Sequence, residues 1–367
     1  MILQSGGPDS CHILTAFLSP GPLLESALPV EWSVLRAVRV VGPGVIEVGD
    51  VPEPSDPGLV TVKVELVGIC GTDTKILAGK IPVDYPRTLG HELIGEIVSV
   101  PEGGPYEPGS RVLVDPAVAC GWCDLCQAGR FNLCRNGGLM GRDVEGVFTE
   151  YVQVPVGRLI PIPEPVSAKA SGLLQVLGTC VHAVKTVDVF PGRVAAVIGL
   201  GVAGQLITQL LAIRGVRVVG ITRSEWKRDL AARSGAEEVA EPSRASEVLS
   251  ELTSGRGPDL VVEAVGKETT LAQSIELARI GGEVVVFGTL TGGGQGLPYY
   301  DLYHKELTIH NPRAALIGDY ADGVALAASG KLSLEPIVSH ELDLDEAERA
   351  FDLVDDSASL KVLMTVA

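Results

Sequence analysis

Two patterns of apolar residues divide the chain. From Val34 to about residue 154, short β-type runs alternate with turns that contain Gly and Pro, as in VTVKVELVG (60–68) and RVLVDP (111–116). Runs of this length and spacing are typical of strands in a small barrel or folded sheet. A helical stretch is expected next, over roughly residues 167–187.

The second pattern begins at Arg193. Apolar, β-branched runs are separated there by segments long enough for helices. The runs are RVAAVIG (193–199), VRVVGIT (216–222), DLVVEAVG (259–266), EVVVFGT (283–289) and LTIHN (307–311). Alternation of continuous apolar strands with helices predicts a doubly wound α/β domain, in which both faces of a parallel sheet are covered.

The tail of the chain fits neither pattern as a further repeat. A helix is expected over 321–329, and the segments after it should return to the first domain. We therefore expect a β-rich domain from residues 34–180 and 317–367, around an α/β domain of residues 181–316. Residues 1–33 have little periodicity and are interpreted as a flexible extension, or as the result of a start codon placed too far upstream.

Charge and cysteine usage narrow the classes of function. The chain has 367 residues and a net charge of −17, so nucleic acid and anionic membrane surfaces would repel it. No run of 18 apolar residues occurs, and no basic residue precedes Arg36, so neither a membrane span nor a secretory signal is expected. Seven cysteines, mostly clustered, favour metal binding in a reducing cytoplasm over a disulfide framework.

A glycine motif opens the α/β half. Gly199, Gly201 and Gly204 form G-x-G-x-x-G between an apolar strand and a helix. Such glycines allow a pyrophosphate to approach the helix N-terminus, which attracts anions. The sequence therefore predicts a dinucleotide site here.

The tip of the next predicted strand indicates which dinucleotide binds. It reads Thr222-Arg223-Ser224, with no carboxylate that would repel a 2′-phosphate. The Arg223 guanidinium could pair with that phosphate, which favours NADP over NAD. The alternative is that Arg223 is a solvated surface charge.

Four cysteines lie within 15 residues, in a lobe expected to span residues 115–136. Cys120, Cys123, Cys126 and Cys134 follow C-x2-C-x2-C-x7-C. Four thiolates can close a tetrahedral zinc site and leave no open position, so a structural role is expected. An iron–sulfur cluster is the alternative.

Three further residues that could bind a metal ion precede this lobe. GICGTD (68–73) carries Cys70, and GHELIGE (90–96) carries His91 and Glu92. Together with the four-cysteine lobe, GLGVAG (199–204) and SLKVLMTV (359–366), these motifs occur in the order found in zinc-dependent medium-chain alcohol dehydrogenases. The chain resembles that family over about residues 34–367.

The resemblance implies a GroES-like catalytic domain, built from both chain ends, around an inserted Rossmann domain. It also implies that Cys70 and His91 bind a catalytic zinc ion, with Glu92 as a ligand or exchangeable neighbour, so that each chain would hold two zinc ions. The family takes a third ligand from the segment before the first Rossmann strand, where Gln175 aligns and Cys180 is the competitor. Thr179 would contact nicotinamide.

The resemblance assigns further roles and shows departures. Thr72 would pass the proton of the alcohol, Asp73 would brace the loop or a zinc-binding His, and Lys361 would reach the cofactor pyrophosphate, unless it is a surface lysine. Lys75 stands where the family often has a relay His, and Pro101 replaces a usual Gly. His304 and His340 have no motif support and are expected to be ordinary.

The leading hypothesis is a zinc-dependent oxidoreductase that transfers hydride between NADP(H) and a small alcohol or carbonyl substrate, with a lean toward a polyol or sugar. A zinc-free quinone or enone reductase would lack the Cys70, His91 and Glu92 set. A non-catalytic dinucleotide-binding protein would need neither these ligands nor Thr72. A homodimer or homotetramer is expected, and the EVVVFGT strand is a candidate for pairing across subunits.

Overall fold

The computed structural model describes residues 34–290, 294 and 296–366. The expectation for residues 1–33 lies outside the described residues. In the described ranges, no helix is both long and apolar enough to cross a bilayer.

A β-rich domain combines strands from the first half of the chain with the C-terminal strands β17 and β18. Its main sheet has the order β10-β6-β5-β3-β18-β17, and β9 also pairs with β3. The strands are β3 (Val60–Gly68), β5 (Leu93–Ser99), β6 (Arg111–Val114), β9 (Tyr151–Val154), β10 (Leu159–Pro161), β17 (Val338–Asp343) and β18 (Lys361–Thr365). A smaller sheet joins β2 (Val45–Pro52), β1 (Val34–Gly42) and β4 (Arg87–Thr88).

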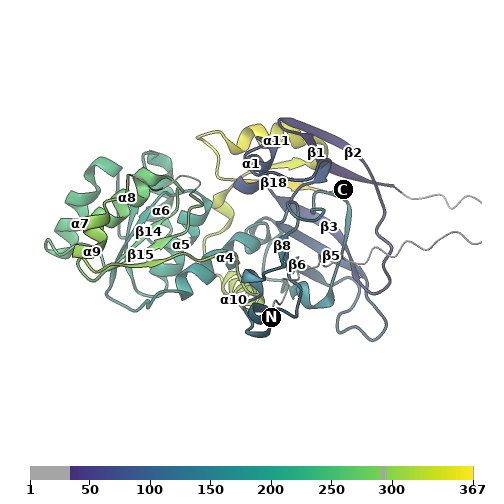
Figure 1. Ribbon diagram of the computed structural model, residues 1–367, viewed down its shortest axis with the longest axis horizontal. Coiled ribbons are helices and arrows are strands. Elements are labelled where there is room, and N and C mark those ends of the chain that lie inside the picture. Colours follow the sequence, from purple (N-terminus) through teal and green to yellow (C-terminus); the bar gives the residue numbers. More distant parts are fainter. Residues whose placement is uncertain (1–33, 291–293, 295, 367) are drawn as a thin grey trace, which may run out of the picture. The chain divides into compact units, whose positions relative to one another are not determined.

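Alternation of side chains builds the core of this domain. Along β3, Val60, Val62 and Val64 are fully buried, whereas Lys63 between them is exposed. The C-terminal strand β18 pairs antiparallel with β3. Two strands that are far apart in the sequence are therefore neighbours in this sheet. Helix α11 (Ala347–Val354) packs on β18 (Figure 1).

The second domain is a six-stranded parallel sheet in the order β13-β12-β11-β14-β15-β16. Its strands are β11 (Val194–Ile198), β12 (Arg217–Ile221), β13 (Glu238–Ala240), β14 (Leu260–Glu263), β15 (Glu283–Val286) and β16 (Thr308–His310). Its helices are α5 (Val202–Ala212), α6 (Glu225–Arg233), α7 (Ala245–Thr253), α8 (Glu268–Leu277) and α9 (Tyr299–His304) (Figure 1).

Both faces of this sheet are covered, as the continuous apolar strands predict. Along β11, Ala195 and Val197 belong to one buried cluster, whereas Val194, Ala196 and Ile198 belong to another. The α/β class with a doubly wound parallel sheet is therefore confirmed.

Two details of the sequence interpretation were wrong. The short strand β13 was missed, because three residues are too few to give a periodic signal. The EVVVFGT run forms β15, which is paired on both sides and cannot extend the sheet into another subunit. The edge on that side is β16.

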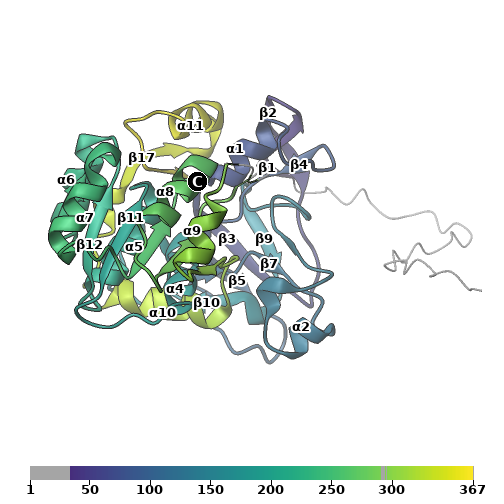
Figure 2. The same ribbon diagram turned by 60° about the vertical axis from the view of Figure 1, so that its left-hand side comes forward.

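Helix α4 (Leu174–Lys185) joins the cores of the two domains. It follows the short helix α3 (Ala168–Ser171), so the expected helical stretch is interrupted near Gly172. One buried cluster contains Leu113 from β6, Leu177 from α4 and Leu206 from α5. Helix α10 (Ile317–Ala328) packs beside α4 (Figure 2). It begins four residues before the expected position, because the Asp319 side chain accepts a hydrogen bond from the Leu316 N–H at 3.0 Å and caps the helix there.

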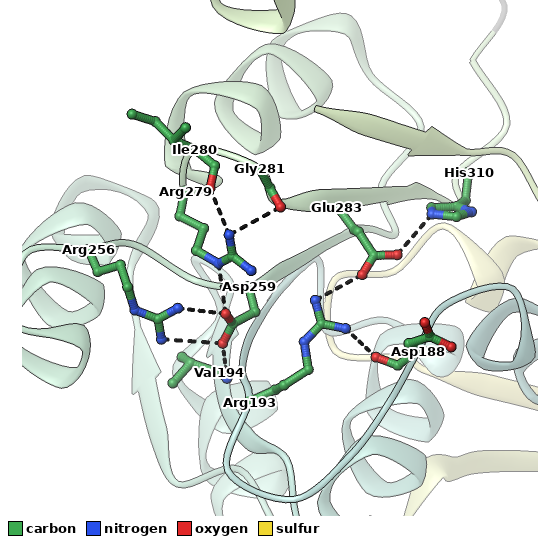
Figure 3. Close-up of polar contacts among 10 residues, drawn as sticks. All are labelled: Asp188, Arg193, Val194, Arg256, Asp259, Arg279, Ile280, Gly281, Glu283 and His310. Atoms are coloured by element: carbon green, nitrogen blue, oxygen red, sulfur yellow. Dashed lines mark hydrogen bonds and ion pairs between the residues drawn. The ribbon is translucent and has the colours of Figure 1, made fainter. Parts of the chain in front are cut away.

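A network of charged side chains lies at the end of the parallel sheet where the strands begin (Figure 3). Asp259, just before β14, accepts hydrogen bonds from the Val194 N–H at 2.8 Å and from Arg256 and Arg279 at 2.6 and 2.7 Å. Glu283, at the start of β15, pairs with Arg193 at 2.8 Å. The network ties the beginnings of β11, β14 and β15 together.

Candidate active site

Three potential ligands converge beside α1 (Gly71–Leu77). Cys70 precedes this helix, and His91 and Glu92 directly precede β5. One ligand atom from each of the three lies within 4.8 Å of the others. His91 and Glu92 are buried, and Cys70 is half-buried.

Asp73 holds these two segments together. Its carboxylate is fully buried and accepts hydrogen bonds from the Cys70 N–H at 2.9 Å and from the Gly90 N–H at 3.3 Å. Gly90 has φ +93, and a Cβ there would collide with the ring of Phe148. A glycine is therefore required directly before His91.

His91 fits a metal ligand. Its Nδ1 is buried, lies 3.5 Å from Oδ1 of Asp73 and has no hydrogen-bond partner among the described residues. Burial lowers the pKa of His91, but the charges of Asp73 and Cys70 outweigh it, so the pKa is raised well above 6.5. The surroundings of His91 therefore favour a positive charge, and a metal cation bound there would supply one.

Lys361 lies at this cluster. Its Nζ is 2.5 Å from Oε2 of Glu92 and donates to the carbonyl of Ile69 at 2.9 Å, and only 3% of the residue is exposed. The alternative of a surface lysine was wrong. The ammonium is engaged by Glu92 and Ile69 in the interior, and its role at the cofactor pyrophosphate stays a prediction.

A cavity of about 330 Å³ opens onto the cluster. Its wall includes Thr72, whose Oγ1 lies 3.8 Å from Sγ of Cys70, and Thr179 on α4. Phe287 and Thr289, which follow β15, line it from the second domain. Lys75 lies on α1 outside this lining, so it contributes no group to the cavity wall.

Gln175 and Cys180 lie on the same helix but face different surroundings. Gln175 lines the cavity and donates from Nε2 to the hydroxyl of buried Tyr320 at 3.3 Å, which leaves its Oε1 available. Cys180 is fully buried in the core, with Sγ 3.8 Å from the carbonyl of Ala203. Burial raises the pKa of Cys180, which disfavours a thiolate.

The four-cysteine lobe has the spacing of a tetrahedral thiolate site. The Sγ atom of Cys134 lies 3.4 Å from that of Cys120 and 3.9 Å from that of Cys123, and the Sγ atoms of Cys120 and Cys126 are 4.0 Å apart. Zinc–sulfur bonds of about 2.3 Å give tetrahedral edges of about 3.8 Å, whereas a disulfide would need about 2.0 Å. All four are free cysteines.

Local backbone groups favour the thiolate of one cysteine in this lobe, whereas burial raises the pKa of Cys126 to about 12. The N–H groups of Arg135 and Cys126 stabilise the thiolate of Cys123 and lower its pKa to about 6. Residues of the lobe, including Phe131, Asn132 and Cys134, also line the cavity described above. The lobe is therefore part of the cavity wall as well as a candidate metal centre.

The glycine motif has the geometry that a dinucleotide site requires. Gly199 ends β11 with φ +95, and Gly201 precedes α5. A Cβ on Gly204 would collide with the carbonyl of Gly199, so no larger residue fits where the helix meets the strand. The motif lies between β12 and β14, at the point where the strand order reverses, which is where such sheets bind ligands.

The tip of β12 carries no carboxylate. Arg223 is exposed there, between half-buried Thr222 and Ser224. Arg228 donates from Nη1 to the carbonyls of Thr222 and Arg223 at 2.8 and 3.0 Å, and it fixes the backbone of the tip.

Sequence reasoning missed several residues of the cavity. Arg142, Arg313 and Asn132 line it, and Tyr320 supports Gln175, but none belongs to a motif. His304 is exposed on α9 and stacks on Tyr300, whereas His340 bonds to Ser339, as expected of ordinary histidines.

The fold and this set of side chains define a class, the metal-dependent dehydrogenases that use a dinucleotide. The profile of the alcohol dehydrogenase GroES-like domain matches residues 56–164, and that of the zinc-binding dehydrogenase domain matches residues 202–329. The chain is 29% identical to sorbitol dehydrogenase of Halalkalibacterium halodurans (88% of this chain, 96% of that protein). It is 30% identical to D-xylulose reductase A of Aspergillus clavatus (86% and 91%).

Solved structures agree. A protein from Sinorhizobium meliloti described as a zinc-binding dehydrogenase bound to NADP shares 34% identity, with a TM-score of 0.84 over 91% of this chain and 99% of that chain. An alcohol dehydrogenase from Escherichia coli complexed with NADH shares 27% identity, with a TM-score of 0.84 over 91% and 99%. The chain belongs to the zinc-dependent medium-chain dehydrogenase family. It is an oxidoreductase that acts on CH–OH donors, and the resemblance seen in its motifs is confirmed.

Proposed function

We propose that the chain oxidises a polyhydroxylated alcohol, or reduces the matching carbonyl compound, with NADP(H) and two zinc ions per chain. The observation that carries the proposal is the convergence of Cys70, His91 and Glu92 on a cavity that Thr179 and the end of β15 also line. The catalytic domain would comprise residues 34–180 and 317–367, and the coenzyme domain residues 181–316.

The residues present suit a catalytic zinc ion. Cys70 and His91 would hold it, with Gln175 Oε1 as a neutral third ligand and Glu92 beside it. When bound, zinc would supply Lewis acidity toward the substrate oxygen, and the nicotinamide would accept or donate hydride. Cys120, Cys123, Cys126 and Cys134 would hold the structural ion.

The chain's own groups have distinct tasks around this site. Asp73 orients His91 from the side of Nδ1, as carboxylates do for metal-binding imidazoles. The hydroxyl of Thr72, in the cavity wall beside Cys70, would take the proton from the substrate hydroxyl and pass it toward solvent. Lys361 compensates the charge of Glu92, so the carboxylate need not bind the cation.

The preference for NADP rests on the tip of β12. Arg223 is exposed where the adenosine ribose of a bound dinucleotide would lie, with Thr222 and Ser224 as hydroxyl donors. The tip has no carboxylate, which is the group that would bind the free 2′-hydroxyl of NAD. The relative solved with NADP supports this choice, although the relative solved with NADH shows that the fold accepts either cofactor.

A polyol or sugar substrate is supported by the relatives. The names of two of them, sorbitol dehydrogenase and D-xylulose reductase A, refer to polyhydroxylated compounds. A zinc-free quinone reductase is not favoured, because it would have no use for the buried ligands Cys70 and His91.

We further propose a homodimer or homotetramer in the cytoplasm. Among the described strands, the edge strand β16 pairs only with β15, and α9, which precedes it in sequence, exposes Tyr299, Tyr300 and Tyr303. An open edge beside aromatic side chains is a favourable surface for pairing between subunits. A cytoplasmic location agrees with free thiols that must stay reduced to bind zinc.

The test is a panel of alcohols, alditols and aldoses, assayed by NADP⁺ reduction with the zinc-loaded protein. The proposal expects turnover of at least one polyol and its loss in Cys70→Ser. Activity that survives Cys70→Ser, or turnover confined to quinones, would overturn it.

A further inference from the structure

Two arginines from separate segments line the cavity that contains Cys70 and His91. Arg142 follows β8 (Gly138–Leu139), and Arg313 lies between β16 and α10. Arg142 is half-buried and Arg313 is exposed. A guanidinium group in a cavity wall can bind a carboxylate through two parallel hydrogen bonds.

Arg142 is held in place before any ligand arrives. Its Nε donates to Oδ2 of Asp143 at 2.8 Å, and its Nη2 is 2.7 Å from the same oxygen. The Leu139 N–H also donates to this oxygen at 2.7 Å. Asp143 occupies one edge of the guanidinium, and the other N–H groups of Arg142 have no acceptor among the residues that the structure describes, so they can bind another one.

Arg313 is positioned through its backbone. Its carbonyl accepts a hydrogen bond from Asn132 Nδ2 at 2.8 Å, and the next residue, Ala314, has φ +53. A left-handed alanine costs energy, and strained residues of this kind cluster at functional sites. Within the described ranges, the Arg313 guanidinium has no ion pair of its own.

Arg313 also lies close enough to influence Asp143. Burial raises the pKa of Asp143, but hydrogen bonds from Arg142 and Leu139 and the charges of Arg142 and Arg313 outweigh it and lower the pKa overall. Both guanidinium groups therefore act on one carboxylate. This part of the wall keeps about one net positive charge.

The other charges of the cavity are balanced locally. Glu92 is paired with Lys361 at 2.5 Å, and His91 faces Asp73. The chain as a whole carries −17, so a positive cavity wall does not reflect the general surface charge. An anionic group on the substrate would meet its partner at this wall.

We propose that the substrate is a polyhydroxylated carboxylic acid, of the aldonate type, whose carboxylate binds Arg313 and Arg142. This inference rests on the proposed function and names its substrate class. In oxidation, a hydride with both electrons of the C–H bond passes from the carbinol carbon to NADP⁺, the hydroxyl proton goes to solvent, and the carboxylate is unchanged. One net positive charge matches a carboxylate better than a phosphate monoester, which carries nearly two negative charges.

The test compares substrates that differ only in the anionic group. The full chain, loaded with zinc, is assayed with NADP⁺ on gluconate and sorbitol, on galactonate and galactitol, and on sorbitol 6-phosphate. We expect the acid to exceed its alditol in kcat/KM by about tenfold or more in at least one pair. Arg313→Gln and Arg142→Gln should each lower that ratio by about tenfold, mainly through KM, because one charge-assisted contact is lost.

Arg349→Gln is the matched control, because Arg349 is exposed on α11 and its ion pair in the described part of the chain is with Glu346. It should leave the ratio unchanged. A preference for alditols, a preference for the phosphate, or an unchanged ratio in both cavity variants would overturn this inference alone. Failure to oxidise any of the compounds would overturn the proposed polyol activity, and the inference with it.

Discussion

The ammonium of Lys361 lies 2.5 Å from Oε2 of Glu92, and neither residue is more than 3% exposed. The two are separated by 269 positions in the sequence. The contact joins the last strand of the chain to the segment that carries His91. It therefore ties the C-terminal return of the chain to the candidate metal site.

Lys361→Met should lower the free energy of unfolding by about 3 kcal/mol, because it leaves the Glu92 carboxylate buried without a cation. Adding Glu92→Gln should recover most of the loss, since the uncompensated charge is then gone. Urea denaturation of the zinc-loaded protein measures both. Lys169→Met, which removes a half-exposed pair with Glu341, is the control and should cost less than about 1 kcal/mol. Additive losses in the double variant would contradict this account.

Gln175→Leu should weaken zinc binding at the Cys70 site, because it removes an amide oxygen from the wall of the cavity that these ligands share. Zinc content after dialysis against a weak chelator should fall from two ions per chain toward one. Cys180→Ala tests the competing ligand and should retain both ions, since its thiol lies in the core near Ala203. Retention in Gln175→Leu with loss in Cys180→Ala would reverse the assignment.

Arg223→Asp should shift cofactor preference toward NAD by about tenfold or more, because a carboxylate repels the 2′-phosphate and accepts a hydrogen bond from the free ribose. The ratio of kcat/KM for NADP⁺ and NAD⁺ measures the change. Arg244→Asp introduces the same charge change at an exposed site outside the tip of β12. An equal shift in both variants would point to overall charge rather than to Arg223.

Asp259→Asn should reduce stability at neutral pH by about 2 kcal/mol. Burial raises the pKa of Asp259, but Arg256, the Val194 N–H and Arg279 outweigh it and lower the pKa to about 2. A depressed pKa stabilises the fold above the unfolded value of about 3.9, and this stabilisation is lost as the pH falls through about 2. The difference between wild type and variant should thus be full at pH 7 and shrink below pH 4.

Urea unfolding across that range measures the effect. Glu247→Gln, at an exposed carboxylate that pairs with Arg244, should change the midpoint much less at every pH. A loss in Asp259→Asn that does not depend on pH would show that packing, rather than the charge network of Figure 3, is responsible.

The fold class and the family could be predicted because their signals are local. Strands such as 194–198 are continuous apolar runs, and the glycines from 199 to 204 lie within one turn. The short strand β13 gave no such signal, and the edge of the sheet could not be located without the pairing of β16. The contact between Lys361 and Glu92 could not be predicted, because the two residues are distant in the sequence.

The residues of the cavity also divide into those marked by a local motif and those brought together only by the fold. The four lobe cysteines are marked by their spacing, and Cys70 and His91 by motifs that resemble the family. Their roles as ligands stay predictions. Tyr320, 145 positions from Gln175, becomes its neighbour only because α10 packs on α4. Arg142 and Arg313 belong to loops without a motif, so only the folded chain brings them to one wall.

The most direct test of the central claim is a zinc anomalous difference map from crystals grown with excess zinc and NADP⁺. The account predicts two peaks per chain, one within the four lobe cysteines and one bounded by Cys70 and His91. A peak at the lobe alone, with nothing between Cys70 and His91, would contradict it.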